Sequence, residues 1–445
     1  MKKVLFLLCL FFVGTVRADW DPFSVYTAKA PEGCVDTTHL SDKLTLPDLI
    51  QIGICNNPTL NRNYMSVKTA EAAYGQSQSS YLPTITAKGS ISQENTRTES
   101  ANSGKDSPYS GNIALSWLIY DFGGRSASAE QMRSYLDSAQ FSYNATLHDT
   151  VLAINQAYFD LLSAQEVLKS AKTSEESFKK SYEESLKRFE LGLVSASDKL
   201  LAKTSYEQSR LSVVQADNAL KKAQGSLAVL LNLSPDTQIS VERPPKDKDM
   251  SRLETDQTIS EMMETALSMR PELKSKESDM VAARQGIEIA RAGALPSLTA
   301  GASAGYNDNW REHNPYRFNT SLGVSLSIPL FTGFSNMYGI EKARYQYSQA
   351  ALSVVETQDV IRNEVWRAYQ DYMTAVDYHD ISQKTLESAL ENERVAFASY
   401  QVGKGSILEL LTAGSQLATA RQQVIVAFYT ILTSKANLYR AIGRF

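Results

Sequence analysis

The sequence of 445 residues is short of several residue types, and each shortage excludes a class of protein. Its three cysteines and four histidines are scattered, without the spacing of a metal site or a catalytic pair. Beyond the N-terminus, no apolar run approaches the roughly 18 residues that a membrane-spanning helix needs. Lysine and arginine number 45 against 49 aspartate and glutamate, with no clustered basic stripe, so nothing supports nucleic-acid binding.

The N-terminus has the pattern of a secretory signal peptide. Lys2 and Lys3 precede an apolar run, Val4–Val13, that is too short to span a membrane. Small residues at Val16 and Ala18 then predict cleavage after Ala18. The loss of three cations with this segment moves the formal net charge of −4 to −7. We therefore expect a mildly acidic, exported chain.

Two cysteines, Cys34 and Cys55, remain in the exported chain, in a compartment that permits disulfides. A bridge between them would close a short N-terminal loop, and the sequence predicts this disulfide. Two buried thiols are the alternative, and neither cysteine has a catalytic or metal-binding spacing.

The chain contains a duplicated unit of about 200 residues, which is too long for a solenoid repeat. Asn57–Leu60 returns as Arg270–Leu273, and the Phe189–Gly192 turn returns as Tyr400–Gly403. Each unit is predicted to run helix, strand, polar loop, strand, very long helix, glycine turn and long helix. The predicted organisation is a signal peptide at 1–18, an N-terminal extension at 19–45, a first repeat at 46–231, a linker outside the helical ring at 232–257, and a second repeat at 258–445.

Two long segments, Ser126–Leu191 and Ile340–Val402, contain neither glycine nor proline. As single helices they would each be on the order of 100 Å long, which is typical of coiled coils or helical barrels. The second segment carries two apolar seams, which indicates neighbours on two sides, as in a closed ring of helices. One seam comprises Ile361, Val365, Ala368, Tyr372 and Ala375, and the other Trp366, Tyr369, Met373 and Val376. An ordinary two-stranded coiled coil is the alternative, but it does not explain the strands below.

A glycine is predicted to end each long helix, at Gly192 and Gly403, and Ser195 and Ser406 follow at N-cap distance. Each repeat thus holds a helical hairpin. The second arms are expected at 193–231 and 405–443.

Four segments alternate between apolar and small polar residues and predict strands. The clearest is Asn319–Leu330, where Leu322, Val324 and Leu326 alternate with serine and glycine. The others are Ile113–Ile119 and, more weakly, Thr84–Gln93 and Ser297–Tyr306. With aromatic residues at their ends, such strands are typical of a transmembrane β-barrel. A soluble, half-buried sheet is the alternative.

Four strands cannot close a membrane barrel, because single-chain barrels need at least about eight. An open edge in lipid would leave backbone groups unpaired, so oligomerisation follows. A trimer would supply twelve strands around a water-filled lumen. The polar segments Glu94–Pro108 and Asn307–Arg317 are then expected to be extracellular connections.

One motif offers an enzymatic alternative. Gly301–Gly305 matches the G-x-S-x-G nucleophile pattern, with Ser303 as the candidate nucleophile. That chemistry needs a sharp strand-to-helix turn, a histidine and an acid. Ser303 instead falls in the middle of a predicted strand, so esterase activity is disfavoured.

From Leu46 to Phe445 the chain resembles the TolC family of outer-membrane efflux and type I secretion proteins. The specific marks are the Asn57-Pro58 and Arg270-Pro271 starts, the Leu-Pro helix-to-strand junctions, the segment Tyr120–Arg125 and the two hairpin tips. The resemblance implies a homotrimer in the outer membrane of a Gram-negative cell. Its twelve-stranded β-barrel would continue into a long α-helical barrel in the periplasm. It would be a passive duct, without enzymatic activity or cofactor, that serves an inner-membrane pump of ABC, RND or MFS type through a periplasmic adaptor. A coiled-coil surface protein without a channel is the alternative function.

The resemblance also implies a periplasmic gate at the hairpin tips. By position, Ser197 and Asp198 match the Thr-Asp pair of the family's gate, and Tyr400 matches its tyrosine. Glu409 and Thr412 match its two pore-lining acids, so one acid is retained and the other is lost. Gly405 stands where the family has the gate arginine, and Lys404 is a candidate substitute for it. We expect a hydrogen bond from the Tyr400 hydroxyl to the Asp198 carboxylate to hold the gate closed. Solvated charges near a helix tip are the alternative interpretation of Asp198 and Glu409.

Overall fold

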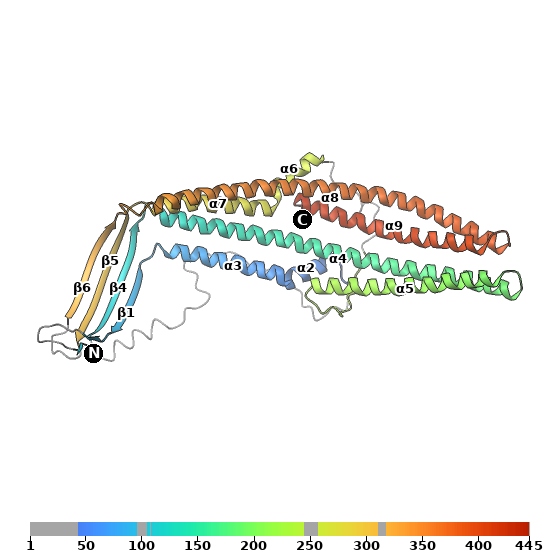
Figure 1. Ribbon diagram of the computed structural model, residues 1–445, viewed down its shortest axis with the longest axis horizontal. Coiled ribbons are helices and arrows are strands. Elements are labelled where there is room, and N and C mark those ends of the chain that lie inside the picture. The colour runs from blue at the N-terminus through green and yellow to red at the C-terminus, as the bar shows by residue number, and fades with distance from the viewer. Residues whose placement is uncertain (1–42, 96–104, 107, 244–256, 310–316, 445) are drawn as a thin grey trace. The chain divides into compact units, whose positions relative to one another are not determined.

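The computed structural model describes residues 43–95, 105–106, 108–243, 257–309 and 317–444 (Figure 1). The predicted signal peptide, Cys34 and parts of the predicted loops and linker lie outside these residues. Within them, one order of elements occurs twice, except that two short strands, β2 and β3, are found in the first series alone. The first series is α2 (Leu46–Asn56), α3 (Pro58–Ser79), β1 (Thr84–Ile91), β2 (Glu94–Asn95), β3 (Lys105–Asp106), β4 (Pro108–Tyr120), α4 (Gly124–Glu190) and α5 (Ala196–Leu230). The second is α6 (Ile259–Met269), α7 (Pro271–Ala292), β5 (Ser297–Asn309), β6 (Arg317–Ser327), α8 (Ser335–Gln401) and α9 (Ile407–Ile442).

Corresponding helices of the two series have matching lengths, which confirms the internal duplication. α4 and α8 each have 67 residues, and α3 and α7 each have 22. The structure splits the first predicted helix of each repeat at a proline, Pro58 or Pro271, which occupies the first position of the following helix. No helix among the described residues is long and apolar enough to cross a membrane.

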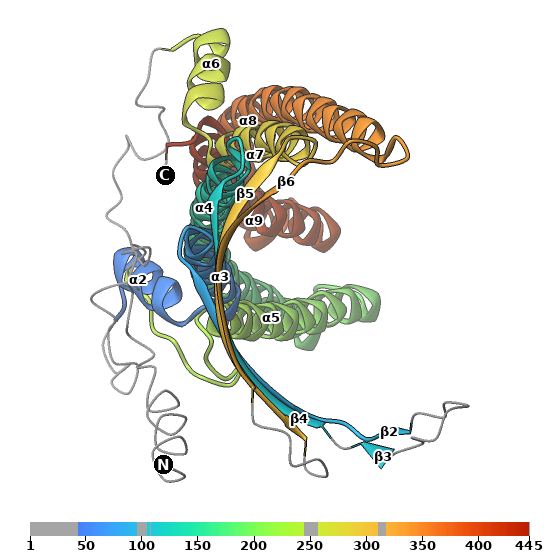
Figure 2. The same cartoon turned by 90° about the vertical axis from the view of Figure 1, so that its left-hand side faces the viewer.

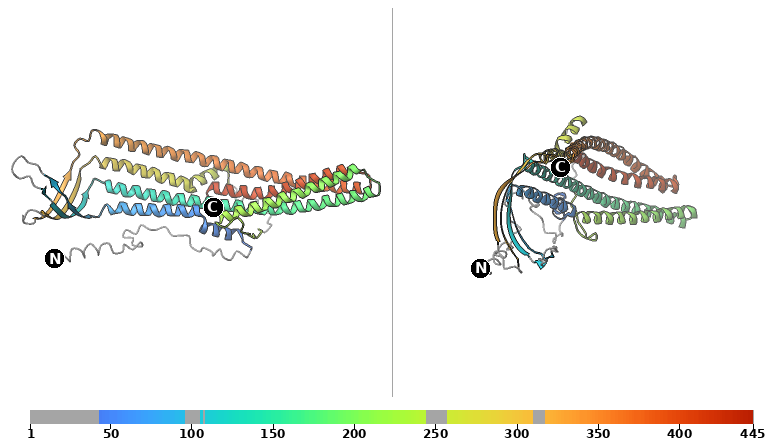
Figure 3. Two further views of the ribbon diagram at one scale, coloured as in Figure 1. Left: turned by 60° about the horizontal axis from the view of Figure 1, so that its bottom comes forward. Right: turned by 60° about the vertical axis from the view of Figure 1, so that its left-hand side comes forward.

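The chain divides into two compact units, and each unit combines segments of both repeats. Of the described residues, those within 65–140 and 274–355 form one unit, and those within 43–64, 141–273 and 356–444 form the other. The first holds the four-stranded sheet and the N-terminal ends of α4 and α8, and the second holds the remainder of α4 and α8 together with α5 and α9 (Figure 3). The duplication is therefore a repeat of sequence and element order rather than of compact domains.

The sheet has the antiparallel order β1-β4-β5-β6 and curves as a single layer (Figure 2). One face carries the predicted apolar residues and is exposed in the single chain, up to 88 % for Leu322. β1 and β6 are the edge strands, and neither pairs with a further described strand on its outer side. The predicted alternation is thus present, and both edges and one apolar face are left uncovered.

The strands differ from the prediction in their bounds and number, since β4 begins at Pro108 and β5 extends to Asn309, both within the predicted loops. β6 ends at Ser327 rather than at Leu330, because Pro329 has no N–H to donate to a ladder. The loop after β1 contains a short two-stranded sheet, in which Glu94 pairs with Asp106 and Asn95 with Lys105. Its strands of two residues are too short to show any periodicity.

In the second unit, a hydrophobic core joins α2 to α4 and α5. Leu49 and Ile52 of α2 pack in one buried cluster with Ile154 of α4 and Leu227 of α5. The approach is close at Gly53, where an added Cβ would lie 2.2 Å from the Ile154 Cδ1 atom. A larger residue would push α2 away from α4.

Candidate functional site at the hairpin tips

The two hairpin tips have the same backbone design. Gly192 and Gly403 follow the long helices with φ of 72° and 74°, in the left-handed region that favours glycine. In the first tip, the Ser195 hydroxyl accepts from the Asp198 N–H at 3.1 Å, and the Asp198 carboxylate accepts from the Ser195 N–H at 3.1 Å. Both predicted turns and both predicted N-cap serines are confirmed.

Glu409 occupies in the second tip the position that Asp198 occupies in the first. Its carboxylate accepts from the Ser406 N–H at 3.1 Å, and the Ser406 hydroxyl accepts from the Glu409 N–H at 3.2 Å. An acid in the first turn also interacts favourably with the helix dipole. Both predicted gate acids therefore have the same local function, the closing of a capping box. The Glu409 residue is otherwise exposed to solvent.

Tyr400 does not form the predicted hydrogen bond to Asp198 within this chain. The residue is only 2 % exposed, and its ring packs in an apolar cluster that includes Ala202 and Leu410. Its hydroxyl oxygen is buried without a hydrogen-bond partner. The physical reason is that the Asp198 carboxylate turns to the Ser195 N–H of its own capping box, while the apolar cluster fixes the ring.

The structure places Arg188, which the sequence analysis did not select, against Tyr400. The guanidinium lies 4.7 Å from the centroid of the Tyr400 ring, and its Nη2 donates to the Gln401 carbonyl oxygen. Its Nε donates to Glu184 at 3.1 Å, and its side chain is 15 % exposed. Arg188 thus connects α4 of the first hairpin to the end of α8 in the second. The signal in the sequence was the difference between Arg188 and Ser399 at equivalent positions of the repeats.

The remaining predicted gate residues make local contacts or none. Ser197 and Lys404 are exposed, and the Thr412 hydroxyl donates to the Leu408 carbonyl of its own helix at 2.7 Å. A Cβ at Gly405 would lie 3.1 Å from the Cβ of Ser399, so the tight turn disfavours a larger residue there.

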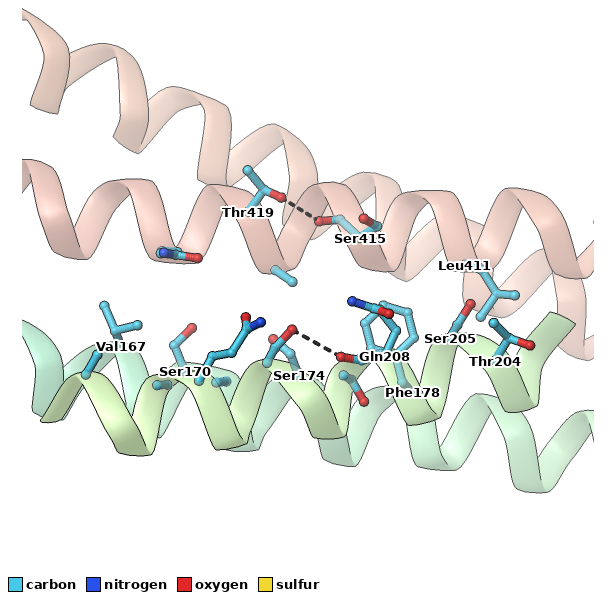
Figure 4. A pocket seen from close by; sticks show the side chains of 18 residues that line it. Val167, Ser170, Ser174, Phe178, Thr204, Ser205, Gln208, Leu411, Ser415 and Thr419 are labelled. Carbon is cyan, nitrogen blue, oxygen red and sulfur yellow. Dashed lines mark hydrogen bonds between the residues drawn. The ribbon is translucent and has the colours of Figure 1, made fainter. Parts of the chain in front are cut away.

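Behind the tips, a cavity of about 620 Å³ lies between α4, α5 and α9 (Figure 4). Its lining contains no charged residue and is mostly small or polar, including Ser170, Ser174, Thr204, Gln208, Ser415 and Thr419, and Val167, Phe178 and Leu411 add apolar surface. Hydroxyl groups at its edge bond to their own helices, as Thr419 does to the Ser415 carbonyl at 3.0 Å. The cavity therefore presents uncharged side chains rather than a reactive group.

A network of charged residues joins four helices in the second unit. Arg270, 3 % exposed, pairs with Glu272 at 2.9 Å and with Glu364. Arg440 pairs with Glu272 at 2.7 Å, with Asp149 at 2.6 Å and with Glu364 at 3.3 Å. Burial raises the pKa of Glu272, but its bonds to Arg270 and the charge of Arg440 outweigh burial and hold the pKa below its ordinary value. The network stabilises the junction of α4, α7, α8 and α9.

Cys55 is disulfide-bonded in the structure. Cys34 lies outside the described residues, so the pairing of the two stays a prediction. No group of histidine, cysteine, aspartate or glutamate within the described ranges could hold a metal ion.

Ser303 of the G-x-S-x-G motif lies in the middle of β5. Its hydroxyl shares a hydrogen bond of 2.8 Å with that of Ser321 on β6. The motif is therefore part of a strand rather than a nucleophile turn.

Comparison with known proteins gives consistent results. A model of the family described as outer membrane efflux protein matches residues 49–233 and 262–444. Protein CyaE of Bordetella pertussis is 28 % identical, over 90 % of this chain and 84 % of its own length. Outer membrane protein TolC of Escherichia coli is 22 % identical, over 91 % and 83 %. The crystal structure of the outer membrane protein VceC from Vibrio cholerae matches with a TM-score of 0.77 at 19 % identity, over 89 % of this chain and 96 % of that one.

Proposed function

The chain belongs to the outer membrane efflux protein family, and we propose that three copies of it form the exit duct of a tripartite efflux or type I secretion system. In this function the duct conducts solutes or polypeptides passively across the outer membrane. The family is one of channels rather than enzymes.

The observation that carries the proposal is the open sheet. β1 and β6 are edge strands, and the exposed apolar face includes Leu322 and Val324. In lipid, each unpaired backbone group costs several kcal/mol, so such a sheet must close. Pairing β6 of one chain with β1 of the next removes every edge, and three chains give a barrel of about twelve strands.

The long helices support the same assembly. Ile361 and Val365 of the first α8 seam are buried within the chain, whereas Trp366 and Met373 of the second seam are exposed. An exposed seam at helical spacing fits a neighbouring copy of the chain.

We also propose the partners. A passive duct needs an energy source, so the helical part would bind a periplasmic adaptor and, through it, an inner-membrane pump of ABC, RND or MFS type. The substrate would be selected largely by the pump.

The gate is proposed at the hairpin tips. Glu409 is exposed there, and threefold symmetry would repeat its carboxylate around the entrance. With Thr412 at the position of the second acid, the ring has a single layer of charge. We expect this ring to attract cations to the entrance and to give a weak, salt-dependent block by a trivalent cation there.

Purified mature protein in a planar bilayer tests the proposal. The expected results are a heat-sensitive trimer on a gel and discrete conductance steps. Loss of the trivalent-cation block in Glu409→Gln would support the gate. A monomer or dimer without conductance would contradict the duct and favour the coiled-coil surface protein.

A further inference from the structure

The register of the sheet separates two faces along every strand. On one face, Leu322 of β6 pairs with Ala302 of β5, and the same row continues through Leu115 of β4 to Ile85 of β1. On the other face, Ser303 pairs with Ser321. Since the apolar face meets lipid in the proposed duct, the second face lines the lumen.

The lumenal face is almost free of charge. Apart from Lys88 and Leu118, its residues with described side chains are serine, threonine, asparagine, glycine and alanine, and hydroxyl pairs such as Ser90 with Ser110, at 2.7 Å, bond to each other. Among the strand residues whose side chains the structure describes, Lys88 is the only charged one.

Lys88 stands in a polar row that crosses the sheet. It pairs with Asn112 on β4, Asn112 pairs with Gly305 on β5, and Gly305 pairs with Asn319 on β6. The Asn112 Oδ1 atom lies 3.4 Å from the position that a Cβ on Gly305 would take, so the missing side chain leaves room for the amide. Lys88 is exposed, and it forms no ion pair with a carboxylate of the described residues.

We infer that Lys88 forms a ring of three positive charges in the barrel lumen and selects for anionic solutes there. The inference rests on the proposed trimeric duct. The ligand class is phosphate- or carboxylate-bearing solutes, because an ammonium group flanked by asparagine amides offers donors to an anion.

The magnitude follows from the surroundings. A cavity that has low-dielectric walls and is lined by one sign of charge raises the local concentration of counter-ions by about tenfold or more at low salt. The effect falls with ionic strength, because the screening length shrinks from about 10 Å at 0.1 M to about 3 Å at 1 M. We therefore expect the Lys88 ring to change anion-to-cation permeability about tenfold at low salt and little at 1 M.

The test measures the reversal potential of single trimers in a salt gradient and their block by inorganic triphosphate. Relative to the wild type, Lys88→Gln should lower the permeability ratio of anions to cations and abolish the block, Lys88→Glu should lower the ratio further, and Lys88→Arg should retain both. Thr86→Lys, which adds a second ring to the same face, should strengthen both. Trimer yield on a gel controls for folding.

The outcomes separate the two proposals. If the wild type gives no conductance, the proposed duct fails. If the wild type conducts but Lys88→Gln and Lys88→Glu leave the permeability ratio and the triphosphate block unchanged, Lys88 does not determine selectivity and the inference is wrong.

Discussion

Arg188 is expected to hold the two hairpin tips together, and its replacement by glutamine should release them. The guanidinium lies over the Tyr400 ring at 4.7 Å and donates to the Gln401 carbonyl. These contacts join α4 to the end of α8. By contrast, the Tyr400 hydroxyl has no hydrogen-bond partner.

The contacts of the Arg188 guanidinium stabilise the joined tips, whereas the Tyr400 hydroxyl contributes no hydrogen bond. A cation–π contact is worth about 0.5–2 kcal/mol, depending on desolvation, and a hydrogen bond from a charged donor about 1.5–3 kcal/mol. Arg188 is 15 % exposed, so little of this is lost to solvent screening. Because the two contributions are not additive, we expect Arg188→Gln to weaken the association of the two tips by about 2–4 kcal/mol per chain. This lowers the ratio of joined to separated tips by at least about 30-fold.

Tyr400→Phe should cost nothing, since it retains the ring and removes an unpartnered buried hydroxyl. Such a group destabilises by about 1–3 kcal/mol, so the variant should be neutral or more stable. Tyr400→Leu removes the ring contact but leaves the hydrogen bond from Arg188 to the Gln401 carbonyl, so it should release the tips less than Arg188→Gln does.

Hydrogen exchange of the peptide spanning 396–410 measures the release directly, and single-channel recording measures its effect on the open fraction. Arg188→Gln should lower protection and raise the open fraction, whereas the matched control Arg394→Gln, an exposed arginine paired with Glu391 on α8, should change neither. The reasoning is refuted if Tyr400→Phe opens the channel while Arg188→Gln does not.

Three further predictions concern other parts of the chain. Val324→Arg should cost about 2–4 kcal/mol near the bilayer midplane and reduce trimer yield, whereas Ser325→Arg on the opposite face should not; equal yields would contradict the barrel. The pKa of Glu272 is held below its ordinary value of 4.5, so its contribution to stability is complete above that pH and is lost as the pH falls through the lower, folded value. Melting temperatures should therefore fall less steeply below pH 4.5 in Glu272→Gln than in the wild type, and parallel curves would show that Glu272 is uncoupled. Finally, unreduced mature protein should bind no thiol reagent at Cys34 or Cys55, and two equivalents bound would exclude the disulfide.

Patterns that repeat over many residues were predictable from the sequence. The long absence of glycine and proline predicted Ser126–Leu191 as one helix, and the structure has Gly124–Glu190. The alternation around Val324 predicted which face of the sheet is apolar. Each of these signals sums over tens of residues, so local exceptions do not obscure it.

Contacts between distant segments were not predictable in the same way. The bond expected between Tyr400 and Asp198 required knowing where each side chain turns, and the capping box of Asp198 competes for its carboxylate. The contact of Arg188 with Tyr400 joins different repeats, and no local pattern encodes it. The pair β2 and β3 was missed for a simpler reason, since two residues show no alternation.

The difference between the two repeats explains why the cation–π contact between the tips occurs once and not twice. Phe189 and Tyr400 occupy equivalent positions, and so do Arg188 and Ser399. At this position the first repeat has a guanidinium and the second has none. Arg188 therefore contacts the ring of Tyr400, whereas Ser399 cannot make a cation–π contact with the ring of Phe189. Phe189 instead takes the ammonium of Lys199 from its own hairpin, at 4.1 Å from the ring centroid. Divergence at this one position thus gives the first hairpin the cation and the second hairpin the aromatic ring of the contact. A Ser399→Arg substitution would restore the symmetry of the sequence without restoring that of the contact, because Lys199 already covers the Phe189 ring.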